Sequence, residues 1–180
     1  MEGIQSWFEY LSTRGDLVTQ TLLQTLTYVV LVTISASIVA IILGVATRHN
    51  PLAKELSLSI ASVFLTIPSL ALFTIFIPIV GLGFVPSFIA LFLYALLPIM
   101  RNTVAGLDAV DSSVLESAKG MGLTSRQILL KVQLPLAWPI MLAGIRVSAL
   151  LTVGISAIAT LVAGGGLGDF IKSGLARLPL

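Results

Sequence analysis

The segment 108–135, DAVDSSVLESAKGMGLTSRQILLKVQLP, is the one long stretch of this chain that is both charged and regularly patterned. Two helix-start signals lie inside it, because Ser113 is followed three residues later by Glu116 and Thr124 by Gln127. In such a capping box the hydroxyl accepts a hydrogen bond from a free backbone N–H, and the acid or amide side chain reaches back. The segment therefore predicts two short helices.

The sequence also predicts the turn between these helices and the end of the second helix. Gly120 and Gly122 adopt positive φ at little cost, so the first helix can end there. Pro135 is predicted to end the second helix, because its ring excludes a continuing helical backbone. Apolar residues share one side of each helix, namely Val114, Leu115, Ala118 and Met121 in the first and Ile128, Leu129 and Val132 in the second. We expect a bent pair of helices that can press on a partner.

Composition identifies the class of protein. Of the 180 residues 57% are hydrophobic and 10% charged, against about 45–50% and roughly 25% in soluble domains. The length allows four or five membrane spans of about 20 residues each. The absence of cysteine excludes a disulfide framework and a thiol nucleophile, and a single histidine, His49, almost excludes a zinc cluster or a His-based triad. A net charge of +2 is too small to suggest nucleic-acid binding.

The uncharged stretches predict an all-α polytopic membrane protein with one domain, 1–180. The expected parts are an interfacial segment at 1–25, spans near 26–46, 56–80, 87–104 and 136–162, and the patterned loop at 108–135. Gly164 to Gly168 is expected to form a turn, because no strand precedes it and no GK[ST] follows it, as a phosphate loop would require. The last residues, 169–180, are expected to form a short amphipathic piece.

Positive charge predicts the orientation. The loops that share a side with the patterned segment hold Arg48, Lys54, Arg101, Lys119, Arg126 and Lys131, whereas the other side holds Arg14, Lys172 and Arg177. The patterned loop is therefore expected in the cytoplasm and the N-terminus outside. Arg146 is expected near the cytoplasmic end of its span, because an arginine at mid-bilayer costs about 2.5–3.5 kcal/mol.

The patterned loop resembles the cytoplasmic loop of binding-protein-dependent ABC importer permeases, which has the form EAA, three residues, G, nine residues, I-x-L-P. Glu116, Ser117 and Ala118 match EAA, Gly122 follows at the family spacing, and 132–135 (VQLP) closes the motif. The departures are serine for the first of the two alanines and valine for isoleucine. The resemblance implies a type I, MetI-like helical bundle with a cytoplasmic two-helix coupling loop.

Longer segments resemble the osmoprotectant branch of these permeases, which imports glycine betaine, carnitine and choline. They are TIPSLALF (66–73), IPIVGLGFVPSFIALFLYALLPIMRNTVAGL (77–107), ESAKGMGL (116–123), LPLAWPIMLAGIR (134–146) and GGGLGDFI (164–171). Members of this branch usually carry one more span after the GGGLGD region, and the sequence at hand ends at Leu180 before it. The resemblance also places the protein in the bacterial inner membrane.

The resemblance implies a non-catalytic subunit with three kinds of partner. These are an ABC ATPase subunit, a second permease subunit (a second copy or a paralogue) and an extracytoplasmic binding protein or fused domain. ATP and Mg²⁺ are expected on the ATPase, and no cofactor on this chain, which has no Walker A sequence. The residues expected to dock the ATPase are Glu116, Ser117, Ala118, Met121, Gly122, Leu123, Leu134 and Pro135. Glu116 either caps its own helix only or also contacts the ATPase.

A translocation path is expected beside the proline kink in TIPSLALF, because a proline in a membrane helix leaves a carbonyl that protein or water must satisfy. The candidate residues are Thr66, Pro68, Ser69, Phe73 and Tyr94. The kink can equally serve packing alone, and for the aromatic residues helix packing is the favoured interpretation. Both interpretations stay open at this point.

Two alternative functions remain. One is a permease of the same fold for another solute, such as methionine, taurine or an ergothioneine-like betaine. The other is a secondary transporter or channel subunit driven by an ion gradient. That class relies on acidic residues inside the membrane or on paired broken helices, and no Asp or Glu falls inside a predicted span.

Overall fold

The computed structural model describes residues 14–176, and every regular element in this range is a helix, as predicted. The long helices are α2 (Gly15–Thr47), α3 (Pro51–Thr66), α5 (Phe84–Asp108) and α8 (Leu134–Ala159). The short helices are α4 (Ser69–Val80), α6 (Ser112–Gly120), α7 (Ser125–Ile128) and α9 (Gly168–Leu175), with a π-helical turn at Leu129–Gln133 and a 3₁₀ turn at Thr160–Val162.

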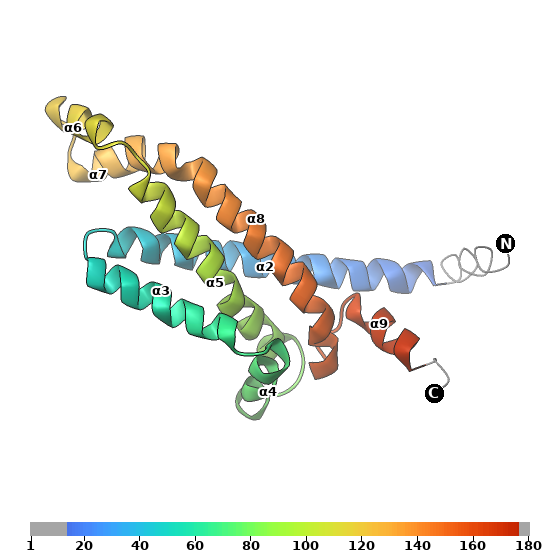
Figure 1. The fold of residues 1–180 in the computed structure, drawn as a ribbon. Helices are drawn as coiled ribbons and strands as arrows, with labels where there is room; N and C mark the ends of the chain where they lie inside the picture. Colours follow the sequence, from blue (N-terminus) through green and yellow to red (C-terminus); the bar gives the residue numbers. More distant parts are fainter. Residues whose placement is uncertain (1–13, 177–180) are drawn as a thin grey trace.

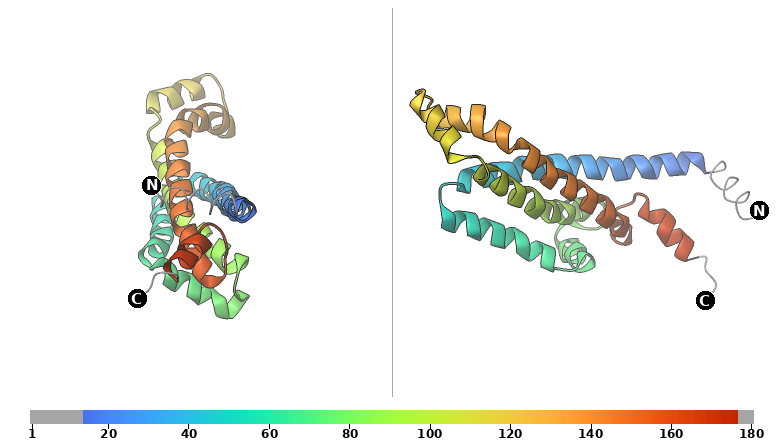
Figure 2. Two further views of the ribbon diagram at one scale, coloured as in Figure 1. Left: turned by 90° about the vertical axis from the view of Figure 1, so that its right-hand side faces the viewer. Right: turned by 45° about the horizontal axis from the view of Figure 1, so that its top comes forward.

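The long helices lie alongside one another in an elongated bundle (Figure 1). At one end, which we call the loop end, α6 and α7 project beyond the neighbouring ends of α2 and α3 (Figure 2). At the opposite end, which we call the glycine end, segment 163–167 links α8 to α9 (Figure 1). A cytoplasmic loop and an outer surface would therefore lie at opposite ends of this bundle.

Among the described residues, three helical stretches are long and apolar enough to cross a membrane: Gly15–Thr47, Phe84–Asp108 and Ser125–Val162. The predicted spans at 26–46 and 87–104 fall inside the first two. The expected boundary at residue 25 is not a break in the helix, because residues 15–25 continue α2; residues 1–13 lie outside the described range. The uncharged Thr- and Gln-rich stretch is simply the first three turns of a longer helix.

The predicted span at 56–80 is divided into two helices, α3 and α4, which meet at 98°. The break lies at Ile67, whose ψ of 130° is extended, immediately before Pro68. Proline disfavours a helical conformation at the residue before it and has no N–H to donate. The bend is therefore a break in the helix, sharper than the kink that the sequence predicted.

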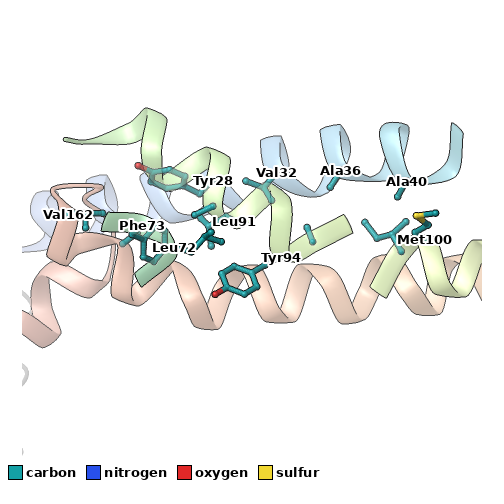
Figure 3. Close-up of a cluster of buried hydrophobic side chains, with 14 residues drawn as sticks. Tyr28, Val32, Ala36, Ala40, Leu72, Phe73, Leu91, Tyr94, Met100 and Val162 are labelled. Atoms are coloured by element: carbon teal, nitrogen blue, oxygen red, sulfur yellow. The ribbon is translucent and has the colours of Figure 1, made fainter. Parts of the chain in front are cut away.

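One core cluster joins α2, α4 and α5 (Figure 3). The contribution of α2 recurs every four residues, at Tyr28, Val32, Ala36 and Ala40, which places all four on one side of the helix. The same side continues to Gly44, where a Cβ atom would lie 2.8 Å from the Thr103 side chain. Small residues along this side let the backbones of α2 and α5 approach closely, as is usual where membrane helices pack.

Hydrogen bonds from α2 hold the glycine end. Gln24 Oε1 accepts from the Gly166 N–H at 3.1 Å, Thr25 Oγ1 accepts from the Leu167 N–H at 2.9 Å, and the Tyr28 hydroxyl donates to the Gly164 carbonyl at 2.6 Å. These bonds satisfy backbone groups that no helix pairs. The segment is the turn that the sequence predicted, and the amphipathic piece expected after it is α9 as far as the described residues extend.

Gly144 tests the packing of α8 on α5. A Cβ atom there would lie 2.6 Å from the Asn102 Cβ and 2.7 Å from the Pro98 carbonyl, whereas nothing lies within 4 Å of a Cβ at Gly154 of the same helix. Gly144→Ala is expected to lower the free energy of unfolding by about 1–3 kcal/mol through overpacking. Gly154→Ala, the matched control, is expected to be neutral or slightly stabilising. Thermal unfolding of both variants in detergent measures the difference, and equal melting temperatures would contradict the packing described.

Candidate functional site

Helix α6 begins at Asp111, whose carboxylate caps it. The Ser113 N–H donates to Asp111 Oδ1 at 2.8 Å, and Ser112 is the first helical residue. The predicted capping box with Ser113 as the cap is therefore wrong, because the acid two residues earlier takes the free N–H first. The hydrogen bond from the Ser113 backbone lowers the pKa of Asp111. Glu116 thus lies inside α6 and does not close a box.

The end of α6 follows the glycine rule. The Leu123 N–H donates to the Ala118 carbonyl at 3.2 Å, and the Gly122 N–H donates to the Lys119 carbonyl at 3.0 Å. Gly122 has a φ of +82°, and together these features form a Schellman motif. The predicted turn is confirmed at Gly122, whereas Gly120 is still the last residue of α6.

The second predicted capping box is confirmed. The Gln127 N–H donates to Thr124 Oγ1 at 3.4 Å, and the Thr124 N–H donates to Gln127 Oε1 at 2.8 Å. This cap starts α7 directly after the turn. Each helix of the loop therefore has its own side-chain N-cap, Asp111 for α6 and Thr124 for α7.

The prediction that Pro135 ends the second helix is wrong. The chain stays helical from Ser125 to Val162, a single stretch of 38 residues. The backbone widens into a π turn over Leu129–Gln133, in which the Leu134 N–H donates to the Leu129 carbonyl, and Pro135 sits in the first turn of α8. A first-turn proline needs no N–H partner, and the wider turn before it accommodates the missing bond. The loop thus consists of one short helix, α6, followed by the N-terminal part of the long helical stretch that begins at Ser125.

Three contacts anchor this loop to the bundle. Gln133 Nε2 donates to the Leu107 carbonyl at 3.2 Å, joining the π turn to the end of α5. A second core cluster of Leu107, Ala137 and Met141 lies at the same level. Lys54 Nζ lies 3.0 Å from Asp108 Oδ2 and joins the start of α3 to the last residue of α5. These contacts link the loop to the ends of α5 and α8.

The residues expected to dock a partner differ in their exposure. Met121 is 73% exposed, and Glu116, Ser117, Gly122 and Pro135 are also exposed, whereas Leu123 and Leu134 are half-buried. Ala118 is only 2% exposed, so the chain itself covers it. The expectation that the Ala118 side chain docks the ATPase is therefore corrected: it is covered within this chain.

The path candidates fall into two groups. Phe73 and Tyr94 lie in the main core (Figure 3), and the Tyr94 hydroxyl donates to the carbonyl of Ile67 at the break between α3 and α4. Thr66 and Pro68 are exposed at the same break, and Ser69 is half-buried. Of the two explanations left open for the aromatic pair, packing accounts for their positions. Tyr94 also satisfies a carbonyl that the proline break leaves free.

Sequence reasoning missed two residues that shape the site, Asp111 and Gln133. A signal for the first was present, because aspartate ranks with serine as a helix cap and stood two residues before the residue chosen. No local signal marks Gln133, since its partner carbonyl is 26 residues away in the sequence.

Comparison with known proteins identifies the fold and the loop. Residues 36–178 match the family described as "Binding-protein-dependent transport system inner membrane component". The chain belongs to this family. Its structure superimposes on a chain of the inward-facing MetNI methionine ABC transporter with a TM-score of 0.75 and 27% sequence identity, covering 86% of this chain and 78% of that one. The MetI-like permease fold predicted from the sequence is thereby confirmed, and the protein is a permease component of a transporter.

Family members with assigned roles are similar over most of this chain. It is 38% identical to the choline transport system permease protein OpuBB of Bacillus subtilis (strain 168), over 93% of this chain and 77% of that protein. It is 44% identical to the glycine betaine/carnitine/choline transport system permease protein OpuCB of the same organism, over 77% of this chain and 64% of that protein. The chain thus spans less than two thirds of the second relative.

The cap of α6 can be tested directly. Asp111→Ala is expected to speed amide hydrogen exchange several-fold in the first turn of α6, because the Ser113 N–H loses its acceptor. Asp111→Asn, the matched control, keeps a capping oxygen and is expected to exchange at the original rate. Hydrogen–deuterium exchange of peptides spanning 111–121 measures both.

The pH dependence of this cap follows from the direction of its pKa. A carboxylate with a lowered pKa stabilises the folded state above its ordinary pKa, and this contribution is lost as the pH falls through the lowered value. The protection factor, which is exchange corrected for the intrinsic pH dependence of the amide rate, is therefore expected to stay constant through the neutral range. A cap that weakened there would contradict the assignment to Asp111.

Proposed function

We propose that this chain is the permease subunit of an ATP-driven importer for small quaternary amines of the glycine betaine, carnitine and choline type. The observation that carries the mechanism is the exposed loop fixed to a continuous helical stretch, Ser125–Val162. A push on α6 and α7 displaces a helix that runs the length of the bundle. Such a rigid element can link nucleotide-driven closure of a partner to outward- and inward-facing states.

The partner at the loop end is an ABC ATPase, which holds ATP and Mg²⁺; the permease itself needs no cofactor. Exposed Met121 offers an apolar contact, and exposed Glu116 offers a charged one beside the turn at Gly122. We place the loop end in the cytoplasm and the N-terminus outside the bacterial inner membrane, because the loop side carries more Lys and Arg. A second permease subunit encloses the path, and an extracytoplasmic binding protein delivers the solute.

The cargo is proposed from the relatives, which are named for choline, carnitine and glycine betaine. The structural match is to a methionine transporter, so methionine is the second candidate. An ion-gradient mechanism is disfavoured both by the family and by the absence of acidic residues from 17–47 and 56–100.

Uptake in a strain lacking this chain tests the cargo. Loss of the chain is expected to abolish uptake of at least one radiolabelled quaternary amine at high osmolarity, and expression of the chain is expected to restore it. Methionine and taurine uptake, measured in the same cells, serve as controls and are expected to stay unchanged. Unaltered uptake of glycine betaine, carnitine and choline, or a selective loss of methionine uptake, would overturn the assignment.

Docking at the turn is tested by Gly122→Asn. Asparagine tolerates the positive φ of this position, and nothing lies within 4 Å of the added Cβ, so α6 and its turn are expected to remain folded. The added side chain obstructs a partner that approaches the turn closely, so uptake and stimulated ATPase activity are expected to fall at least tenfold. Gly120→Ala, equally open but without positive φ, is the matched control and is expected to retain both activities. Normal transport by Gly122→Asn would exclude close approach at the turn.

A further inference from the structure

Helix α3 carries a polar stripe that the packing of this chain does not use. Glu55, Ser59, Ser62 and Thr66 follow one another at spacings of four, three and four residues, which places them on one side of the helix. All four are exposed or half-buried. An adjacent side of α3 exposes the large apolar residues Leu52, Leu56, Ile60 and Val63. The helix thus presents two different surfaces, and only the apolar one suits lipid.

The polar stripe borders a groove between α3 and α5, two helices that lie side by side (Figures 1 and 2). Its volume is about 360 Å³, and its lining comprises Pro51, Lys54, Glu55, Leu58, Ser59, Ser62 and Arg101. This volume holds on the order of ten water molecules. A groove of this size and polarity accommodates a small hydrated solute.

Charge in the groove disfavours a lipid covering. Lys54 is paired with Asp108, but the described residues give Arg101 no acidic partner. Arg101 lies seven residues before the end of α5, or about 10 Å inside the loop end. Charged side chains within a membrane face a water-filled cavity or the interior of a bundle, because hydrocarbon cannot solvate them. The groove therefore opens to water or to another polar surface.

The polar stripe runs from the loop end to the break between α3 and α4. From Glu55 to Thr66 the stripe rises about 16 Å, which is about half of a hydrocarbon thickness of about 30 Å. It begins at the loop end beside the Lys54–Asp108 pair and finishes at the break before Pro68. Thr66 is exposed there, at the position where the sequence predicted the path. The stripe joins that position to one end of the molecule.

We propose that Glu55, Ser59, Ser62, Thr66 and Arg101, which we call the polar lane, line the cytoplasmic half of the solute path. The proposal rests on the importer function and on the cytoplasmic placement of the loop end given above. Hydroxyl groups with one carboxylate and one guanidinium can contact both the cationic and the anionic group of a zwitterion. Because the groove is open, the solute passes along the lane without being enclosed by this subunit alone.

The absence of cysteine from the chain makes the lane directly testable. Ser59→Cys and Ser62→Cys place single thiols in the lane, and their sequence neighbours Ile60→Cys and Val63→Cys place thiols at the same depth on other sides of α3. The control side chains are well exposed in this chain, at 54% and 55%, so burial cannot explain slow labelling. A difference from the lane positions would therefore reflect contact with lipid. All four variants are expressed with the partner subunits in membrane vesicles of either orientation.

The probe is a membrane-impermeant methanethiosulfonate carrying a trimethylammonium group, which forms a mixed disulfide with an accessible thiolate and releases methanesulfinate. The two lane cysteines are expected to react at least tenfold faster than the two controls, and only from the cytoplasmic face. Excess transported solute is expected to slow their reaction. Equal rates at positions 59 and 60, or labelling of lane cysteines from the outer face alone, would overturn the proposal.

The labelling pattern can be separated from the importer function. Solute uptake by each unlabelled variant and by the cysteine-free parent reports whether the assembly transports a quaternary amine at all. If the parent transports none, the proposed function fails. The labelling rates of the cysteine variants still report whether water reaches the lane. If the parent transports but the lane cysteines stay unlabelled, a second copy or lipid covers the groove, and only the lane is refuted.

Discussion

The close approach of α8 to α5 is the constraint on which the rest of the structure depends. At Gly144 a hydrogen atom faces the Pro98 carbonyl, and at Gly106 the Ala137 carbonyl lies 2.9 Å from where a Cβ would be. In a bilayer, helix association gains little from burying apolar surface, so contact at short range must supply the stability. The two helices therefore form one closely packed pair, and both of them reach the loop end.

In the proposed mechanism, this pairing would let the loop act as a lever although it is small. Helix α6 alone has nine residues, and isolated helices of that length are marginally stable. Its stability comes from the Asp111 cap at one end and the Schellman turn at the other. The π turn then carries the chain into α8 without a break, so force applied at the turn reaches the helix pair and is not absorbed by a hinge.

The sequence predicted the helical class, the membrane location and the two-helix loop, because each depends on local composition or on short-range capping. The Thr124 box and the Gly122 turn are of this kind, since the atoms involved are at most five residues apart. Other features could not be foreseen from local rules. Pro135 would end an isolated α-helix, but the π turn before it and the packing of Ala137 and Met141 against Leu107 keep the chain helical.

The helix break illustrates a different limit. Pro68 indicates a kink, yet its angle of 98° depends on what each half packs against. Leu72 and Phe73 of α4 enter the main core (Figure 3), and the Tyr94 hydroxyl donates to the freed Ile67 carbonyl. A partner 27 residues away thus compensates the break, and no pattern within the segment could have indicated it.

At the loop end, an ion pair joins helix α3 to α5. The Lys54–Asp108 pair is partly exposed, with side-chain exposures of 28% and 54%, and such surface pairs contribute about 0–1 kcal/mol. By contrast, α5 and α8 meet through glycine contacts that tolerate no added atom. In the proposed mechanism, a displacement of the loop would carry α5 and α8 as a unit and be relieved where α3 meets α5. That boundary is the wall of the polar lane, so the joint that yields most easily is the one whose opening would widen the proposed path.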